Sequence, residues 1–403
     1  MNSIQNEKTT VSEAFLPLLK KEKPSLFDRL LLCFIFLAAS VYLPLILFHP
    51  LPSEARDGFS ILICALSILA QVRLSKKIGS GIGHAILLFL VGSLLGGAQT
   101  AAVVGATVSC ACIFCWLSLT TASPLLIALP LLSYAGATVA IGSPFSGALA
   151  LISMPLALLL LFSVRTLRPK VSAVCLISLG ILVSAAVAAV LYLLLAHNGI
   201  SMELIRETVD SLRELLTAEI AARLSLLGEE LGDLLSTDAA HPEYARILAN
   251  EVINHLPAIL ILLCNGIALI THSTMMRILL SVELPKERLA PLVVFDMSAT
   301  SAVVFLASLF LSLAADGPEL ALMGAVCENL YLILIPGMIL TLWMYLNVWL
   351  LAKAPSCFGL LLYLAIPLLV IQLPSVLLPL AAVIGAVLLL IGKIRRRTLQ
   401  KKS

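Results

Sequence analysis

The sequence predicts an all-α protein, a polytopic transmembrane helix bundle of about twelve spans with one extracytoplasmic amphipathic helical insert. Three observations predict this class. The 403 residues are 60% hydrophobic and only 12% charged, whereas an average soluble domain is about 25% charged. Apolar segments of about 20 residues fill most of 27–392, and each can cross a hydrocarbon core of roughly 30 Å as a helix. One charged stretch, 201–251, interrupts them.

The apolar segments give the predicted spans. They are 27–48, 59–72, 78–97, 100–119, 122–142, 145–163, 171–196, 257–276, 291–313, 320–352, 358–373 and 376–391. The segment 320–352 is too long for one upright helix. We expect a single kinked or tilted helix there, since two short helices broken at Pro336-Gly337 would add a crossing and move the last basic cluster to the other side of the membrane.

Basic residues mark one side of the predicted bundle. They lie before the first span, at alternate connections and at the end of the chain: Lys20, Lys21, Lys23, Arg29, Arg73, Lys76, Lys77, Arg165, Arg168, Lys170, Arg277, Lys286, Arg288, Lys353, Lys393, Arg395, Arg396, Arg397, Lys401 and Lys402. Cytoplasmic loops carry this excess of Lys and Arg. We therefore expect a multi-pass protein of the bacterial cytoplasmic (inner) membrane with both termini cytoplasmic and the first span retained.

This threading predicts five parts. They are a cytoplasmic N-terminal tail (1–26), an N-terminal transmembrane bundle (27–196), an extracytoplasmic acidic helical insert (197–255), a C-terminal transmembrane bundle (256–392) and a basic cytoplasmic tail (393–403).

The charged stretch 201–251 predicts two helices. It has eleven acidic and four basic residues, a net charge of about −7 in a chain of net charge +3. Apolar residues recur in it at steps of three and four: Ile205, Val209, Leu212, Leu216, Ile220, Leu224, Leu227, Leu231 and Leu234. This period predicts an amphipathic helix with Ser201 as its N-cap, and a second short helix from about His241-Pro242. The acidic face argues against binding to anionic lipid, so the apolar stripe rests on this protein's own helices or on a partner.

Ionisable and amide side chains at membrane depth are the candidate site residues, because charge there is costly. They are Glu328, Asn265, Asp296, His272 and His84. At about 1.5 Å per residue, Glu328 and Asn265 lie at a similar depth from the outer side, and the other three lie nearer the inner side. The first pair predicts either a solute- or proton-handling site or a packing hydrogen bond. The other three predict either a proton-responsive or cation-binding cluster or separate groups solvated near the interface.

Motifs for catalysis are absent from the sequence, which has no phosphate loop, HExxH or nucleophile elbow. Cys110, Cys112 and Cys115 have a metal-like spacing, but Cys110 and Cys112 point to different sides of a helix and no His or acid lies nearby, so we interpret them as packing residues. We therefore predict no enzyme, cofactor, metal or nucleic-acid partner. The predicted partners are the lipid bilayer, a small solute of unknown identity and a membrane or ATPase subunit, since ATP-driven work would need one.

The C-terminal part resembles a known family. Val294-Phe-Asp-Met-Ser298 opens one span, Glu328-Asn-Leu330 and 341–349 lie in the next, and a span with Gly385 ends in Gly392-Lys-Ile-Arg-Arg-Arg397. With the order of its parts, 80–397 resembles the YybS-like family of uncharacterised bacterial multi-spanning membrane proteins. That family is distantly similar to the substrate-binding membrane subunits of energy-coupling-factor vitamin transporters. The resemblance implies a small-solute transporter or a substrate-binding subunit. The insert leaves open an envelope assembly or scaffold protein that binds a partner.

Overall fold

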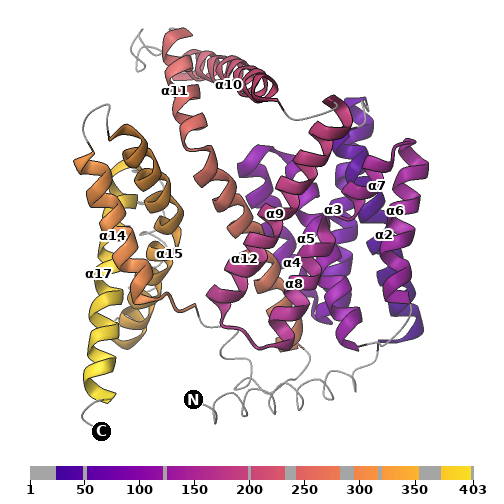
Figure 1. Cartoon of the computed structure of the whole chain (residues 1–403). Coiled ribbons are helices and arrows are strands. Elements are labelled where there is room, and N and C mark those ends of the chain that lie inside the picture. Colours follow the sequence, from indigo (N-terminus) through magenta and orange to yellow (C-terminus); the bar gives the residue numbers. More distant parts are fainter. Residues whose placement is uncertain are drawn as a thin grey trace. The chain divides into compact units, whose positions relative to one another are not determined.

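The computed structural model shows an all-helical protein (Figure 1). It describes residues 24–48, 52–120, 125–197, 201–231, 242–281, 295–315, 320–353 and 374–400, and every regular element in these ranges is a helix. Eight helical segments among the described residues, with Pro144–Arg165 counted as one, are long and apolar enough to cross a membrane. The chain is therefore a multi-spanning membrane protein, as predicted, while the total of twelve spans and the side on which the insert lies stay predictions.

Two compact units make up the chain. The first contains Met1–Asn198 and Leu263–Phe295, and the second contains Gly199–Leu262 and Asp296–Ser403. The helices of the first are α2 (Leu26–Phe48), α3 (Ser53–Ser75), α4 (Ile78–Gly96), α5 (Ala98–Thr120), α6 (Leu125–Ile141), α7 (Pro144–Ala150), α8 (Ser153–Arg165) and α9 (Lys170–His197). Those of the second are α10 (Met202–Leu231), α11 (Pro242–Asn254), α14 (Ala299–Ala314), α15 (Ala321–Lys353) and α17 (Pro374–Gln400). The helix α12 (Leu256–Ser281) contributes its first residues to the second unit and the rest to the first.

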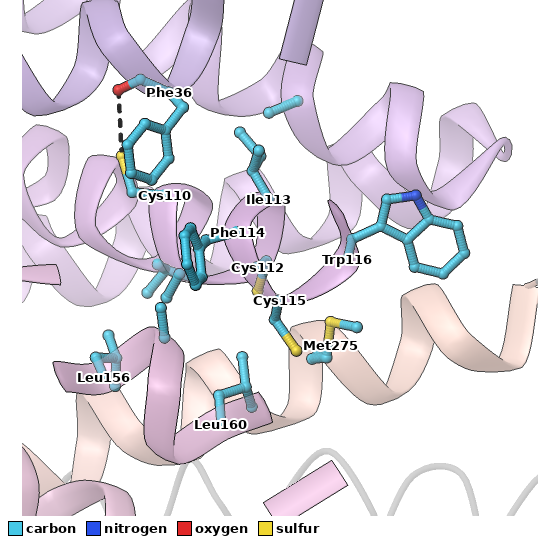
Figure 2. Packing of buried hydrophobic residues seen from close by; sticks show 14 of the residues in the cluster. Phe36, Cys110, Cys112, Ile113, Phe114, Cys115, Trp116, Leu156, Leu160 and Met275 are labelled. Atoms are coloured by element: carbon cyan, nitrogen blue, oxygen red, sulfur yellow. Dashed lines mark hydrogen bonds between the residues drawn. The ribbon is translucent and has the colours of Figure 1, made fainter. Parts of the chain in front are cut away.

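The helix α5 forms the centre of the first unit, because α2, α3, α4 and α8 all pack against it. Its sequence is rich in small residues, which let helices approach closely in lipid. Cys110, Cys112 and Cys115 are fully buried in this core (Figure 2). The Cys110 thiol lies 3.7 Å from the main-chain oxygen of Phe36, and the Cys112 thiol lies 3.8 Å from that of Thr271. These cysteines are packing residues, as the sequence predicted.

Two glycines set the spacing of α3, α4 and α5. A Cβ on Gly81 would lie 2.7 Å from the nitrogen of Val72 in α3, and a Cβ on Gly92 would lie 2.0 Å from the Cα of Ala101 in α5. At both positions the absence of a side chain allows the two backbones to approach closely. The start of α4 thus lies beside the end of α3, and the end of α4 lies beside the start of α5. The helices α3 and α5 therefore run in the same direction.

In the second unit, α15 packs against α14 and α17. It continues through Pro336 as one helix, which confirms the prediction of a single helix over this long segment. A Cβ on Gly385 of α17 would lie 2.1 Å from the main-chain oxygen of Met338 in α15. The two helices are in contact there because glycine has no side chain.

The insert forms a pair of packed helices, α10 and α11. The Ser201 hydroxyl accepts a hydrogen bond from the Leu204 nitrogen at 3.0 Å, which confirms the predicted N-cap. Ala245 and Ala249 of α11 are buried, and Arg213 of α10 donates from Nε to the Asn250 side-chain oxygen at 2.8 Å. The apolar stripe of α10 is therefore covered at least in part by this protein's own α11. The predicted stripe position Leu234 lies outside the described residues.

Two of the predicted spans differ from the observed helices in a way that affects the fold. The segment 145–163 forms two helices, α7 and α8, separated by a turn at Leu151-Ile152, and Ser143 caps α7 by accepting from the Phe145 nitrogen. The helix α14 begins at Ala299 instead of residue 291, because the Ser298 hydroxyl caps it by accepting from the Ser301 nitrogen. The predicted span 358–373 lies outside the described residues.

Candidate functional site

A polar pocket in the second unit is the best candidate site. It is a cavity of about 470 Å³ between the junction of α11 with α12, the end of α14 and the first turns of α15. Ligand pockets typically have volumes of about 300–1,000 Å³. The polar residues that line it are Glu251, Asn254, His255, Ser312, Glu328, Asn329 and Tyr331. We call this cavity the junction pocket.

The junction itself explains why polar groups gather there. The helix α11 ends at Asn254, His255 forms a turn, and α12 begins at Leu256. The residue after Leu256 is Pro257, which has no N–H to donate and is tolerated best in the first turn of a helix. The first N–H groups of a helix have no partner within it. The junction therefore needs a hydrogen-bond acceptor from another element.

Asn329 of α15 supplies that acceptor. Its Oδ1 accepts from the Ala258 nitrogen at 3.1 Å, and its Nδ2 donates to the main-chain oxygens of Asn254 at 3.0 Å and Ala325 at 2.9 Å. One side chain thus bonds the last residue of α11, the first turn of α12 and its own helix. This clamp fixes the junction against α15 and so sets the position of the neighbouring Glu328.

Glu328 and His255 face each other in the pocket. The distance from His255 Nε2 to Glu328 Oε1 is 3.8 Å, too long for a hydrogen bond. The Glu328 side chain is 44% exposed. His255 Nδ1 is buried and has no hydrogen-bond partner among the described residues. Both groups therefore keep hydrogen-bonding capacity for a ligand.

The lining of the junction pocket is acidic. Glu251, one helical turn before His255, adds a second carboxylate, and none of the described residues that line the pocket is Lys or Arg. An unbalanced pair of carboxylates attracts cations. The described ranges contain no group of three or more His, Cys, Asp or Glu side chains that could hold a metal ion. The described lining of the pocket therefore carries an excess of negative charge.

Of the predicted site residues, Glu328 alone lines the junction pocket. Asn265 is half-buried on the part of α12 that belongs to the first unit, whereas Glu328 belongs to the second. The predicted pairing of these two residues stays a prediction.

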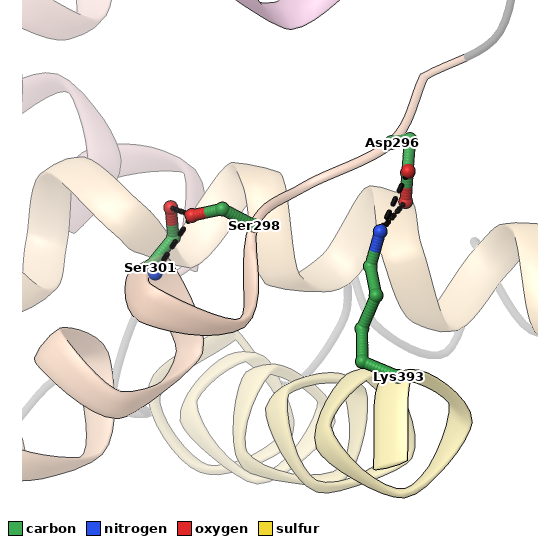
Figure 3. A network of polar contacts seen from close by, with 4 residues as sticks. All are labelled: Asp296, Ser298, Ser301 and Lys393. Atoms are coloured by element: carbon green, nitrogen blue, oxygen red, sulfur yellow. Dashed lines mark hydrogen bonds and ion pairs between the residues drawn. The ribbon is translucent and has the colours of Figure 1, made fainter. Parts of the chain in front are cut away.

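Asp296 has a different position from the one expected. The sequence placed it inside a span, but it lies in the extended residues before α14, and its side chain is 52% exposed. Its two carboxylate oxygens accept from Lys393 Nζ at 2.6 and 2.7 Å (Figure 3). The physical reason is the Ser298 cap, which starts the helix after Asp296 and leaves the carboxylate free to pair with α17.

His272 and His84 both lie in the first unit and are buried. His272 is 0% exposed, and neither of its ring nitrogens has a hydrogen-bond partner among the described residues. The structure therefore shows no hydrogen bond between His272 and His84. A cluster of these residues with Asp296 stays a prediction.

The sequence did not point to Glu251, His255 and Asn329. Glu251 and His255 stand four residues apart, a spacing that puts both on one face of a helix, and this was the signal available. His255 lies between the insert and a span, where a histidine looks like an ordinary loop residue. The role of Asn329 depends on a contact between residues more than 70 positions apart, which no local pattern reveals.

Comparisons with known proteins give no further information on this site. No family model matched the chain, and no match was found among curated proteins or among solved structures.

Proposed function

We propose that this protein is a small-solute transporter, or the solute-binding subunit of one, in the bacterial cytoplasmic membrane. The observation that carries the proposal is the junction pocket, in which Glu328 and His255 face each other without a hydrogen bond. Both side chains keep hydrogen-bonding capacity, so a ligand that bonds with them gains the free energy of those bonds.

The proposed solute is a small organic cation. Glu251 and Glu328 supply two carboxylates, and the side chains of Asn254 and Ser312 add neutral polar groups. An ammonium or guanidinium group donates several hydrogen bonds to carboxylates, and charge-assisted bonds of this kind are stronger than neutral ones.

The topology proposed above makes the junction pocket an outward-facing site. Twelve spans with both termini cytoplasmic put the insert outside, and the pocket lies where α11 of the insert meets α12. The basic residues at alternate connections support this orientation. Glu207→Cys on the insert is expected to react with a membrane-impermeant maleimide in intact cells, and Lys76→Cys is expected to react only after permeabilisation.

Thermal unfolding of the purified full chain tests the solute proposal. Putrescine, spermidine, lysine and arginine are added in turn, with glutamine as the neutral and glutamate as the anionic comparison. At least one cation is expected to raise the unfolding temperature, and Glu328→Gln is expected to abolish that shift. Glu207→Gln on α10 is the matched control and should keep it, because Glu207 does not line the pocket. The proposal fails if no cation shifts the wild type or if Glu328→Gln behaves like the control.

A partner subunit is the second part of the proposal. The YybS-like resemblance and the similarity of that family to energy-coupling-factor subunits support an ATPase complex in which this chain captures the solute. Transport would then require co-expression of the ATPase, whereas solute binding would not.

An envelope scaffold is the alternative function. It is favoured by apolar side chains that remain exposed on the insert, namely Leu215 of α10 and Ile247 of α11. A photo-crosslinker at Leu215 would capture a partner protein reproducibly if the insert is a docking surface. Crosslinks only to this chain's own helices would exclude that function.

A further inference from the structure

A buried group of uncharged polar side chains lies between α3 and α5 in the first unit. It consists of Ser67 and Gln71 of α3 and Ser109 of α5, which are 4%, 2% and 1% exposed. Neither serine oxygen and neither polar atom of the Gln71 amide has a hydrogen-bond partner among the described residues. We call these three residues the buried amide cluster.

The helix geometry brings the three side chains together. A Cβ on Gly105 of α5 would lie 3.6 Å from the Ser67 hydroxyl oxygen, so this oxygen faces the α5 backbone. Gln71 follows Ser67 by one helical turn, and Ser109 follows Gly105 by one turn. Because α3 and α5 run in the same direction, Gln71 and Ser109 lie at the same level, one turn beyond the contact of Ser67 with Gly105.

Some hydroxyl groups of the same bundle bond within their own helix, whereas others, including those of Thr138 and Ser163, also have no partner among the described residues. Serine and threonine in helices usually donate to the carbonyl four residues earlier. The hydroxyl groups donate to main-chain oxygens: that of Ser60 to Arg56 at 2.9 Å, that of Thr107 to Val103 at 2.9 Å and that of Ser40 to Phe36 at 2.8 Å. Ser67 and Ser109 make no such bond, and their hydroxyl oxygens are buried without a partner among the described residues.

A cavity adjoins the cluster at Ser67. It has a volume of about 220 Å³ and lies between α3, α4 and α5. Ser67 and Gly105 are among its lining residues, and the other described lining residues are almost all apolar, including Leu88 and Phe89. Ile86 and Phe89 of the lining are 55% and 50% exposed, so the cavity opens on the apolar surface of the bundle.

We propose that the first unit binds an uncharged amphiphile taken from the bilayer. The apolar body occupies the cavity between α3, α4 and α5, and an amide or hydroxyl head bonds Ser67, Gln71 and Ser109. The ligand is uncharged, because none of the described residues that line the cavity or form the cluster is charged, and an unpaired charge is strongly disfavoured in such a site. The Gln71 amide offers two donors and one acceptor oxygen, which match a carboxamide head. This site is independent of the junction pocket.

Octanamide is a suitable probe, since it has an apolar chain and a primary amide head. The full chain is placed in nanodiscs, and binding of radiolabelled octanamide is measured against empty nanodiscs of the same lipid. The wild type is expected to bind octanamide saturably, and octanoate at least about tenfold more weakly, because a buried site without a cation disfavours a carboxylate.

Substitutions locate the site. Gln71→Leu keeps a side chain of similar size, removes both polar atoms of the amide and is expected to raise the dissociation constant at least about tenfold. Ser67→Ala and Ser109→Ala are each expected to raise the dissociation constant about threefold. These two variants replace Gln71→Leu in the test if that variant does not fold. Ser60→Ala is the matched control, since Ser60 is buried on the same helix but its hydroxyl is already bonded to Arg56.

Two results would overturn the proposal. One is equal partitioning of octanamide into protein-containing and empty nanodiscs. The other is saturable binding that the cluster variants leave unchanged relative to Ser60→Ala, which would place the amphiphile elsewhere on the chain.

Discussion

The clamp made by Asn329 gives a prediction whose magnitude follows from the structure. Asn329→Ala removes two hydrogen bonds from α15 to other elements, one with the Ala258 nitrogen and one with the Asn254 carbonyl. A hydrogen bond contributes about 0.5–1.5 kcal/mol net, and interhelical bonds in membrane proteins average about 0.6 kcal/mol. The two bonds are therefore worth about 1–2 kcal/mol. The better helix propensity of alanine offsets up to about 0.7 kcal/mol, so the net loss is about 1 kcal/mol.

Asn254→Ala is the matched control for this substitution. Asn254 takes part in the clamp through its main-chain carbonyl, which alanine keeps. Its exposed side chain should contribute less than about 0.5 kcal/mol to stability. Both variants introduce alanine for asparagine, so the comparison separates the clamp bonds from the change in composition.

Reversible unfolding in mixed micelles with increasing dodecyl sulfate, followed by circular dichroism, measures both free energies. We expect Asn329→Ala to unfold at a lower detergent fraction than the wild type and Asn254→Ala to coincide with it. The clamp argument is refuted if the two variants are equally stable. It is refuted as well if Asn329→Ala matches the wild type.

Three further substitutions test the packing and the positions of predicted site residues, all by the same unfolding measurement. Gly385→Ala should destabilise by at least about 1 kcal/mol, because its Cβ would overlap the Met338 carbonyl, whereas Gly266→Ala, with open space around it, should not destabilise. Asp296→Asn should cost less than about 1 kcal/mol and leave solute binding unchanged, since its pair with Lys393 is half-exposed and outside the junction pocket. His272→Leu should be neutral or stabilising, because the buried imidazole nitrogens have no partner among the described residues; a loss above about 2 kcal/mol would reveal a bonded or liganded histidine.

The sequence predicted the helices well where apolar length alone decides them. Hydropathy marks the part of a helix that can lie in lipid, but main-chain hydrogen bonds continue beyond that part. The segment 59–72 therefore became α3, which runs from Ser53 to Ser75. Gln71 lies near the end of the predicted span, and α3 packs it into the bundle with 2% exposure.

The candidate site could be predicted only in part, for a related reason. Glu328 is conspicuous because a carboxylate in an apolar segment is rare. The prediction for Asp296 used the same rule and was wrong about the helix, since the Ser298 cap starts α14 later than the apolar run suggests. The partners His255 and Asn329 depend on how α15 packs beside the junction. That packing depends on residues far apart in the chain, and a periodic pattern cannot encode it.

Glu328 and Asn329 are neighbours on α15, and the structure separates their roles. Asn329 makes all its bonds with main-chain groups, and Glu328 makes no hydrogen bond with His255 at 3.8 Å. Loss of Asn329 should thus lower stability and weaken solute binding together, because the junction would shift relative to Glu328. Loss of the Glu328 charge in Glu328→Gln should abolish binding at nearly unchanged stability, since the side chain is 44% exposed. If Glu328→Gln instead destabilises the fold as much as Asn329→Ala, the carboxylate is a structural group and the junction pocket is not a solute site.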